Sequence, residues 1–174
     1  MACIFCAIAS KKVQPKTVYE DEHLLAVLPD EPAVAGHILV IPKKHLPIFE
    51  EMDDTLTSHV FSIANKLSIA LFESIGAQGT NILVQNGIPA GQEVAHFSIN
   101  ILPRKENDLL NLEWQVKQLS DEETSTIELT LKEGIEKLQQ TDKKAVAEKQ
   151  EATALSVSTG GEENYLIKQL RRIP

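Results

Sequence analysis

The chain has 174 residues, 43% of them apolar, and a formal net charge of −8 at pH 7, which is enough apolar material for one ordinary hydrophobic core. Its acidic balance argues against a nucleic-acid partner, because non-specific binding to a phosphate backbone depends on clustered cations. No run approaches the ~18 consecutive apolar residues of a membrane span, and the first residues lack the basic region of a secretory signal. We therefore expect a cytoplasmic protein with neither a nucleic-acid nor a membrane partner.

The first part of the chain alternates between strand-like and loop-like segments. Residues 17–28 predict two strands around the polar turn at residues 20–22. Residues 29–36 contain two prolines and a glycine and predict a loop. Residues 37–42, with the sequence HILVIP, are rich in β-branched side chains and predict the next strand.

A helix is predicted from Asp53 to about Ile75, because the apolar period changes there from that of a strand to that of a helix. Its stripe has spacings of 4, 3, 4 and 4 and consists of Leu56, Val60, Ile63, Leu67 and Leu71. Asp53 suits the positive N-terminal end of a helix, and Gly76 suits its stop.

After this helix the pattern returns to strands. Residues 80–87 predict one strand, residues 88–92 a loop, and residues 93–103 a second strand. The order of strands, one long helix and further strands predicts an α+β domain, in which the helix packs on a largely antiparallel sheet.

Residues 116–174 predict a C-terminal helical extension that follows a first domain of residues 1–115. Ser120 and Glu123 have the spacing of a capping box. A helical stripe follows, which consists of Ile127, Leu131, Ile135 and Leu138. Trp114, the only tryptophan, is expected to be a packing anchor for this part of the chain.

The second half of the extension has less pattern. Residues near 139–161 are polar and lack a clear stripe, which predicts a flexible segment or a frayed helix. The tail from residue 162 regains an apolar stripe with cations at its end, which predicts a short helix that docks back.

Four residues could form a metal site. Cys3 and Cys6 form a C-x2-C pair, and thiolates and neutral imidazoles are the ligands that tetrahedral zinc favours. His45 and His96 could complete the set only if the fold brings them to the cysteines. Two alternatives stay open on these residues alone: two buried cysteines with unrelated histidines, or a thiol redox pair.

The predicted strand at residues 93–103 carries a polar row. With a period of two, His96, Ser98 and Asn100 point to one side of it, and apolar residues point to the other. His23 lies in a turn and His59 on the polar side of the long helix, so we expect both to face solvent.

The chain resembles the histidine triad (HIT) superfamily in four stretches: CIFCAIAS, VYEDEHLLAVL, GHILVIPKKHL and GQEVAHFSINILPR. The resemblance implies a HIT-like fold with an antiparallel five-stranded sheet, and a homodimer in which two such sheets join. In the zinc-bearing C-x2-C branch, the metal ligands correspond to Cys3, Cys6, His45 and His96. The resemblance therefore implies zinc as the cofactor.

The triad itself is degenerate, since it reads His96-Phe97-Ser98-Ile99-Asn100. In working members the middle histidine forms a covalent nucleotidyl intermediate, and that position is Ser98. A serine hydroxyl needs an adjacent base, and His37 is the remaining candidate, although a structural role for it is the more favoured interpretation.

Two further positions depart from the family pattern. The ribose-binding carboxylate is shifted by one residue to Asp30, and Glu93 stands where members place a phosphate-binding Ser or Thr. A carboxylate at ~4 Å from a phosphate oxygen costs about 1 to 4 kcal/mol. The remaining candidates for contact with a purine nucleotide are Gln85, Asn86, Gln92, Ser98 and Asn100.

These residues predict a zinc-holding protein of the superfamily that lacks the histidine nucleophile and serves as a disabled nucleotide-binding or scaffold protein. The alternative is an active nucleotidyl hydrolase or transferase, acting on a nucleoside phosphoramidate or a dinucleoside polyphosphate through Ser98. The sequence leaves open whether the chain is an enzyme, and the replaced nucleophile position favours the interpretation that it is not.

Overall fold

The computed structural model describes residues 3–159, and the side chains as far as residue 141. A first unit extends to Glu113 and a second begins at Trp114. The helices and strands of the first unit are, in chain order, α1 (Ile4–Ala9), β1 (Lys16–Glu20), β2 (Leu24–Leu28), β3 (Ile38–Pro42), η1 (Phe49–Glu51), α2 (Asp54–Ile75), β4 (Gly79–Val84), η2 (Ile88–Ala90) and β5 (Ile99–Arg104).

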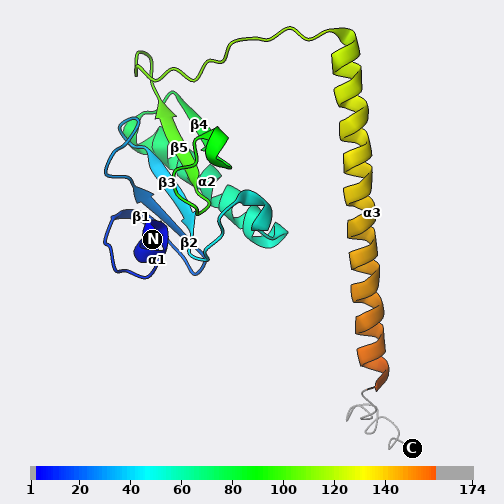
Figure 1. The fold of residues 1–174 in the computed structure, drawn as a ribbon. Coiled ribbons are helices and arrows are strands. Elements are labelled where there is room, and N and C mark those ends of the chain that lie inside the picture. The colour runs from blue at the N-terminus through cyan, green and yellow to red at the C-terminus, as the bar shows by residue number, and fades with distance from the viewer. Residues whose placement is uncertain (1–2, 160–174) are drawn as a thin grey trace, which may run out of the picture. The chain divides into compact units, whose positions relative to one another are not determined.

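The five strands form one sheet in the order β1-β2-β3-β5-β4, and every neighbouring pair is antiparallel. Figure 1 shows this sheet with α2 against it and the short α1 near β1 and β2. The predicted α+β fold, with five antiparallel strands and one long helix, is confirmed. None of the described helices is long and apolar enough to cross a membrane.

Alternation along β2 separates two apolar layers. Leu24 and Ala26 belong to the main core, which also contains Val60 and Ile63 of α2. Leu25 and Val27 point to the other face, where they pack with Ile41 and with Phe5 and Ile8 of α1. Because both faces of β2 are buried, its sequence is the continuous apolar run LLAVL.

The ends of α2 follow the predicted cap residues. The Asp53 carboxylate accepts a hydrogen bond of 2.9 Å from the Leu56 N–H, and Gly76 adopts the left-handed conformation with φ 64°. The helix Asp54–Ile75 therefore agrees with the prediction at both ends.

The predicted strand at residues 93–103 is wrong in its first half, because β5 begins only at Ile99. The backbone N–H groups before it have other partners: the His96 N–H donates to the Val94 carbonyl at 2.7 Å, and the Phe97 N–H donates to the Leu46 carbonyl at 2.6 Å. His96 and Phe97 are 1% and 2% exposed. The polar row is thus broken, with His96 in a loop and Asn100 in the strand.

The second unit contains α3 (Asp121–Thr159). Its capping box is confirmed, since the Glu123 N–H donates to Ser120 Oγ at 3.2 Å and Glu123 Oε2 accepts from the Ser120 N–H at 2.9 Å. Trp114 is 85% exposed, and its role as a packing anchor stays a prediction.

The less patterned part of the extension is described only in part. Residues 139–159, for which the sequence suggests a flexible segment or a frayed helix, belong to α3. The predicted docking helix of the tail lies outside the described residues. The division into domains 1–115 and 116–174 stays a prediction.

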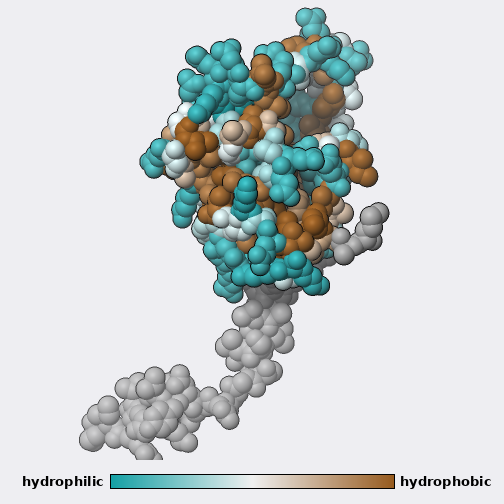
Figure 2. Space-filling view, turned by 90° about the vertical axis from the view of Figure 1, so that its left-hand side faces the viewer, coloured by the Kyte–Doolittle hydropathy of each residue, from teal (hydrophilic) through white to brown (hydrophobic). Residues whose placement is uncertain are grey.

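The surface of the described residues mixes polar and apolar side chains. On the face shown in Figure 2, which is the side of β1 and α1 in Figure 1, apolar residues form several separate patches between polar ones.

Candidate metal centre and the adjoining cavity

The fold brings Cys3, Cys6, His45 and His96 together, and their donor atoms all lie within 4.8 Å of one another. Cys3 precedes α1 and Cys6 lies in its first turns, so one short helix supplies both sulfurs. His45 follows β3, and His96 lies in the loop before β5. Three segments far apart in the sequence therefore meet at one point.

The distances in this cluster suit a tetrahedral ion. Cys6 Sγ lies 3.2 Å from His45 Nδ1 and 3.6 Å from His96 Nδ1. Cys3 Sγ lies 3.4 Å from His96 Nδ1, and the two Nδ1 atoms are 3.2 Å apart. Zinc bonds to nitrogen and sulfur would give ligand–ligand separations of about 3.3–3.8 Å. The side chains present could therefore hold a metal ion, and their chemistry fits zinc.

His96 is also oriented for this role. Its Nε2–H donates to the Pro42 carbonyl at 2.8 Å, which leaves the Nδ1 lone pair directed at the cysteines. Burial lowers the pKa of His96, so the ring is held in its neutral, ligand-competent form. Burial also raises the pKa of Cys6, as does the neighbouring Cys3, because burial and a second sulfur nearby both disfavour the charged thiolate.

The position of the two histidines counts against a thiol redox pair. A redox C-x2-C motif does not require two imidazole nitrogens within 3.6 Å of its sulfurs. Both cysteines are free thiols. The cluster is thus better described as a potential metal centre.

A cavity of about 240 Å³ lies beside this centre and contains the degenerate triad position. Its lining comprises Phe5, Pro29, Glu31, Leu39, Gln85, Gly91, Gln92, Glu93, Val94, Ser98 and Asn100. Four predicted nucleotide contacts, Gln85, Gln92, Ser98 and Asn100, therefore meet in one place. Asp30 and Asn86 do not line it.

The structure shows why Asp30 and Asn86 do not line the cavity. Glu31, one position after Asp30, lines the cavity in its place, although both carboxylates are exposed. Asn86 is turned to Glu50, to whose carboxylate it donates at 2.8 Å, and its oxygen accepts from the Phe49 N–H. Asn86 therefore holds a loop together.

His37 is joined to the cavity by a chain of hydrogen bonds. Its Nδ1 accepts from the Ala33 N–H at 3.2 Å, and its Nε2–H donates to Asn100 Oδ1 at 3.0 Å. The Asn100 amide then donates to Gln85 Oε1 at 3.4 Å. Burial lowers the pKa of His37, so the ring is neutral with both nitrogens occupied, and it is not free to accept a proton from Ser98.

Gln92 is likewise occupied within the protein. Its amide donates to the Pro47 carbonyl at 2.7 Å and the Val94 carbonyl at 2.9 Å, and its oxygen accepts from the Gly87 N–H at 2.7 Å. The side chain thus fixes the loop that precedes β5.

His59 faces solvent only in part, with 35% of its side chain exposed. Its Nε2–H donates to Asp21 Oδ2 at 2.7 Å, and the same carboxylate accepts from Tyr19 and from the backbone of His23. Partial burial opposes ionisation of Asp21, but these hydrogen bonds outweigh it and lower its pKa. The sequence offers little indication of this contact, because Asp21 lies in the β1–β2 turn and His59 lies far along the chain on α2.

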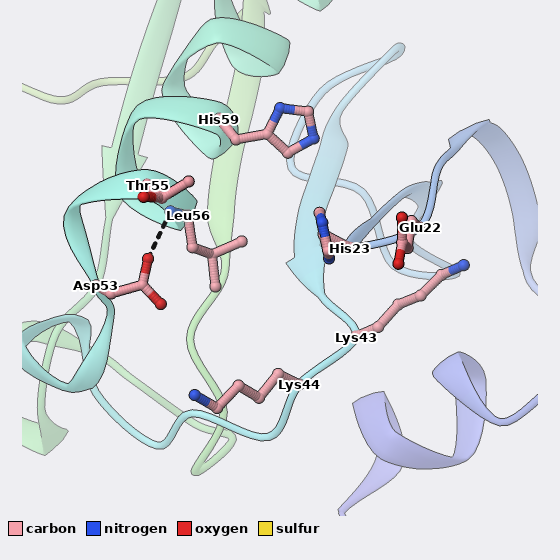
Figure 3. Close-up of a pocket in the computed structure, with 8 residues that line it drawn as sticks. All are labelled: Glu22, His23, Lys43, Lys44, Asp53, Thr55, Leu56 and His59. Atoms are coloured by element: carbon pink, nitrogen blue, oxygen red, sulfur yellow. Dashed lines mark hydrogen bonds between the residues drawn. The ribbon is translucent and has the colours of Figure 1, made fainter. Parts of the chain in front are cut away.

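A larger cavity of about 770 Å³ lies next to this pair and shares no lining residue with the cavity at Ser98. It is lined by Glu22, His23, Lys43, Lys44, Asp53, Thr55, Leu56 and His59. Figure 3 shows that the residues come from α2 on one side and from the β1–β2 turn and the end of β3 on the other. Its charges are mixed, and Asp53 is already used as a helix cap, so its lining favours no single ligand.

The five-stranded antiparallel sheet, the long helix and the Cys–Cys–His–His centre define a HIT-type fold that carries a potential metal site. The chain belongs to the HIT family: the HIT domain family model matches residues 10–107.

Three proteins illustrate the similarity. An uncharacterised HIT-like protein of Methanocaldococcus jannaschii is 45% identical over 107 residues, which cover 61% of this chain and 81% of that protein. Adenylylsulfatase HINT3 of Arabidopsis thaliana is 38% identical over 62% of this chain and 55% of its own length. The crystal structure of a zinc-bound histidine triad family protein from Mycobacterium smegmatis superposes with a TM-score of 0.61 at 31% identity, covering 67% of this chain and 85% of that one.

Proposed function

We propose that this protein is a zinc-holding member of the HIT family that lacks histidine-nucleophile chemistry and serves as a nucleotide-binding or scaffold protein. One observation carries the proposal. Both histidines that could assist Ser98 are already occupied: His96 in the Cys–Cys–His–His centre, and His37 between Ala33 and Asn100.

The chemical argument concerns activation of the nucleophile. A serine hydroxyl attacks phosphorus only when a nearby base takes its proton. Asn100 replaces an imidazole by an amide, which cannot take a proton at neutral pH. Loss of a covalent nucleophile commonly costs roughly 5 to 8 kcal/mol of barrier. The proposed protein therefore binds without turnover.

The proposed role of zinc is structural. Two cysteines and two histidines complete a tetrahedral coordination sphere and leave no position for an activated water. Support comes from the ligand distances and from the zinc-bound relative. Zinc would fasten the start of the chain and α1 to the loops that carry His45 and His96.

Turnover of adenosine phosphoramidate and diadenosine polyphosphate tests this function. We expect rates at background for the zinc-loaded chain and for Ser98→Ala alike. A Ser98→His, Asn100→His double variant is the informative comparison, because gained activity would show that only the chemistry is missing. Turnover that Ser98→Ala abolishes would overturn the proposal. Elemental analysis of the same preparation should give one zinc per chain.

The second candidate is an active nucleotidyl hydrolase or transferase. The relative named adenylylsulfatase favours it, since that protein is 38% identical over most of the same region. This candidate requires Ser98, or water, to act with a base that His37 and His96 do not supply, and the Ser98→Ala comparison separates the two functions.

We further propose a homodimer in the cytoplasm. β4 is an edge strand of the sheet, and it exposes Ile82 by 44%. Phe61, Ile69 and Phe72 of α2 are also 38 to 50% exposed. An unpaired edge beside exposed apolar side chains supports association with a second copy.

A further inference from the structure

The cavity at Ser98 has few hydrogen-bond donors left for a ligand. Asn100 uses its oxygen for His37 and its amide for Gln85 and the Leu83 carbonyl. Gln92 is occupied at both ends. The Gln85 side-chain oxygen accepts a hydrogen bond from Asn100, so only the Gln85 amide group is left for a ligand. Of these polar side chains, the Gln85 amide and the Ser98 hydroxyl therefore remain as donors.

The charges of the same cavity are negative. Glu31 and Glu93 both line it from exposed positions, and the described residues of its lining include no lysine, arginine or histidine. A phosphate carries only acceptor oxygens, so it would face two carboxylates with few side-chain donors to stabilise it. An ammonium group has three donors and no acceptor, which is the complement of this lining.

An aromatic ring adds to the same preference. Phe5 of α1 lines the cavity, and its ring meets the His96 ring edge to face with centroids 5.7 Å apart. The face of an aromatic ring attracts cations. Phe5 thus places an aromatic ring in the same lining as the two carboxylates.

We infer that this cavity selects its ligands by charge and takes an organic cation, such as an amine carried by a nucleoside, rather than a phosphate. The inference rests on the proposed function, because it takes this cavity to be the binding site, and it narrows the ligand from a nucleotide to a nucleoside that carries an amine. Glu93 and Glu31 are the residues that determine specificity, and their carboxylates accept hydrogen bonds from the amine.

Calorimetry on the zinc-loaded full chain tests this inference with adenosine, AMP and 5′-amino-5′-deoxyadenosine. We expect the aminonucleoside to bind most tightly and AMP most weakly, at least ~10-fold apart, which corresponds to ~1.4 kcal/mol. Glu93→Gln and Glu31→Gln should each reduce this ratio. Glu106→Gln makes the same change of net charge at an exposed residue that does not line the cavity, and should leave the ratio unchanged.

Three results would overturn the inference. AMP binding as tightly as the aminonucleoside would contradict charge selection but leave a binding function intact. A ratio that Glu106→Gln reduces as much as Glu93→Gln would assign the preference to net charge instead of the cavity. Failure of all three compounds to bind the folded protein would remove both the inference and the nucleoside-binding part of the proposed function, whereas turnover of a phosphoramidate would remove only the claim of lost chemistry.

Discussion

Ser98 and Asn100 share one cavity but differ in what they hold in place. Asn100 joins a buried histidine to Gln85, with His37 8% exposed. Ser98 stands at the position that the resemblance assigns to the nucleophile, and its small hydroxyl fixes none of these neighbours. A change at Ser98 can therefore leave the hydrogen bonds between His37, Asn100 and Gln85 intact.

The first prediction concerns Asn100. In an Asn100→Ala variant the Nε2–H of His37 loses its acceptor in a buried place, which costs about 1–3 kcal/mol. Urea unfolding should therefore show a lower free energy of unfolding by that amount. Ser98→Ala is the matched control in the same cavity, and we expect a change within about 0.5 kcal/mol. Equal effects of the two substitutions would contradict the hydrogen-bond chain.

The second prediction concerns pH. Burial lowers the pKa of His37 below its ordinary value, so the unfolded chain binds a proton more readily than the folded one just below pH ~6.5. Stability should be complete above this pH and fall as the pH falls toward the lowered pKa. A His37→Gln variant should lose this part of the slope in unfolding measured from pH 7.5 to 5.5. An unchanged slope would show that His37 is not the group responsible.

Sequence patterns identified the cluster residues but could not give their geometry. The resemblance assigned Cys3, Cys6, His45 and His96 to a metal site, and the fold brings all four together. Glu31 lines the cavity and Asp30 does not, because which of the two faces it depends on how the loop turns; the assignment of Asp30 to a nucleotide stays a prediction. Periodicity cannot supply that turn, because a loop has none.

At the scale of the elements, the apolar patterns predicted the strands and α2 well, because burial on a sheet or helix face repeats with the period of the element. The exception is the segment before β5. Its residues have strand-like composition, but their N–H groups bond to Val94 and Leu46 instead of a neighbouring strand. The amino-acid composition of this segment indicates that it is buried, but it does not indicate which groups its backbone N–H groups bond to.

α1 is the element that should depend most on metal. It has six residues, far fewer than the ~12–15 that an isolated helix needs. Chelation of zinc should therefore lower the melting temperature and raise amide exchange first in α1. Zinc at a hundredfold excess over its Kd would stabilise the fold by about 2.7 kcal/mol. The Cys6→Ala variant should have a lower melting temperature than the wild type, and chelator should not change it. If chelator also left the melting temperature of the wild type unchanged, the metal centre would be contradicted.

The contact between the β1–β2 turn and α2 depends on Asp21. An Asp21→Asn variant keeps the shape but weakens the charge-assisted bonds from Tyr19 and His59. We expect a loss of about 1–3 kcal/mol in urea unfolding. Asp30→Asn, an exposed change of the same kind, should cost less than about 0.5 kcal/mol. The account of this contact fails if both variants unfold at the same urea concentration.

For the whole molecule, the edge strand β4 and the exposed apolar side of α2 lead to the proposed dimer. Sedimentation at micromolar concentration should give twice the mass of one chain. Phe72→Glu places a charge on the exposed side of α2 and should produce monomers, because a buried unpaired charge is costly. Glu73→Gln, at an exposed neighbouring position, is the control. A monomeric wild type would exclude the dimer.

Loss of covalent chemistry is the central claim, and a single-turnover experiment tests it most directly. The zinc-loaded chain, in excess, is mixed with adenosine phosphoramidate, quenched in an alkaline denaturant that preserves P–N bonds, and weighed by intact-mass spectrometry. The account predicts an unmodified chain at every time point, and the double variant Ser98→His, Asn100→His is measured beside it for comparison. An adenylylated wild-type chain, absent from Ser98→Ala, would contradict it.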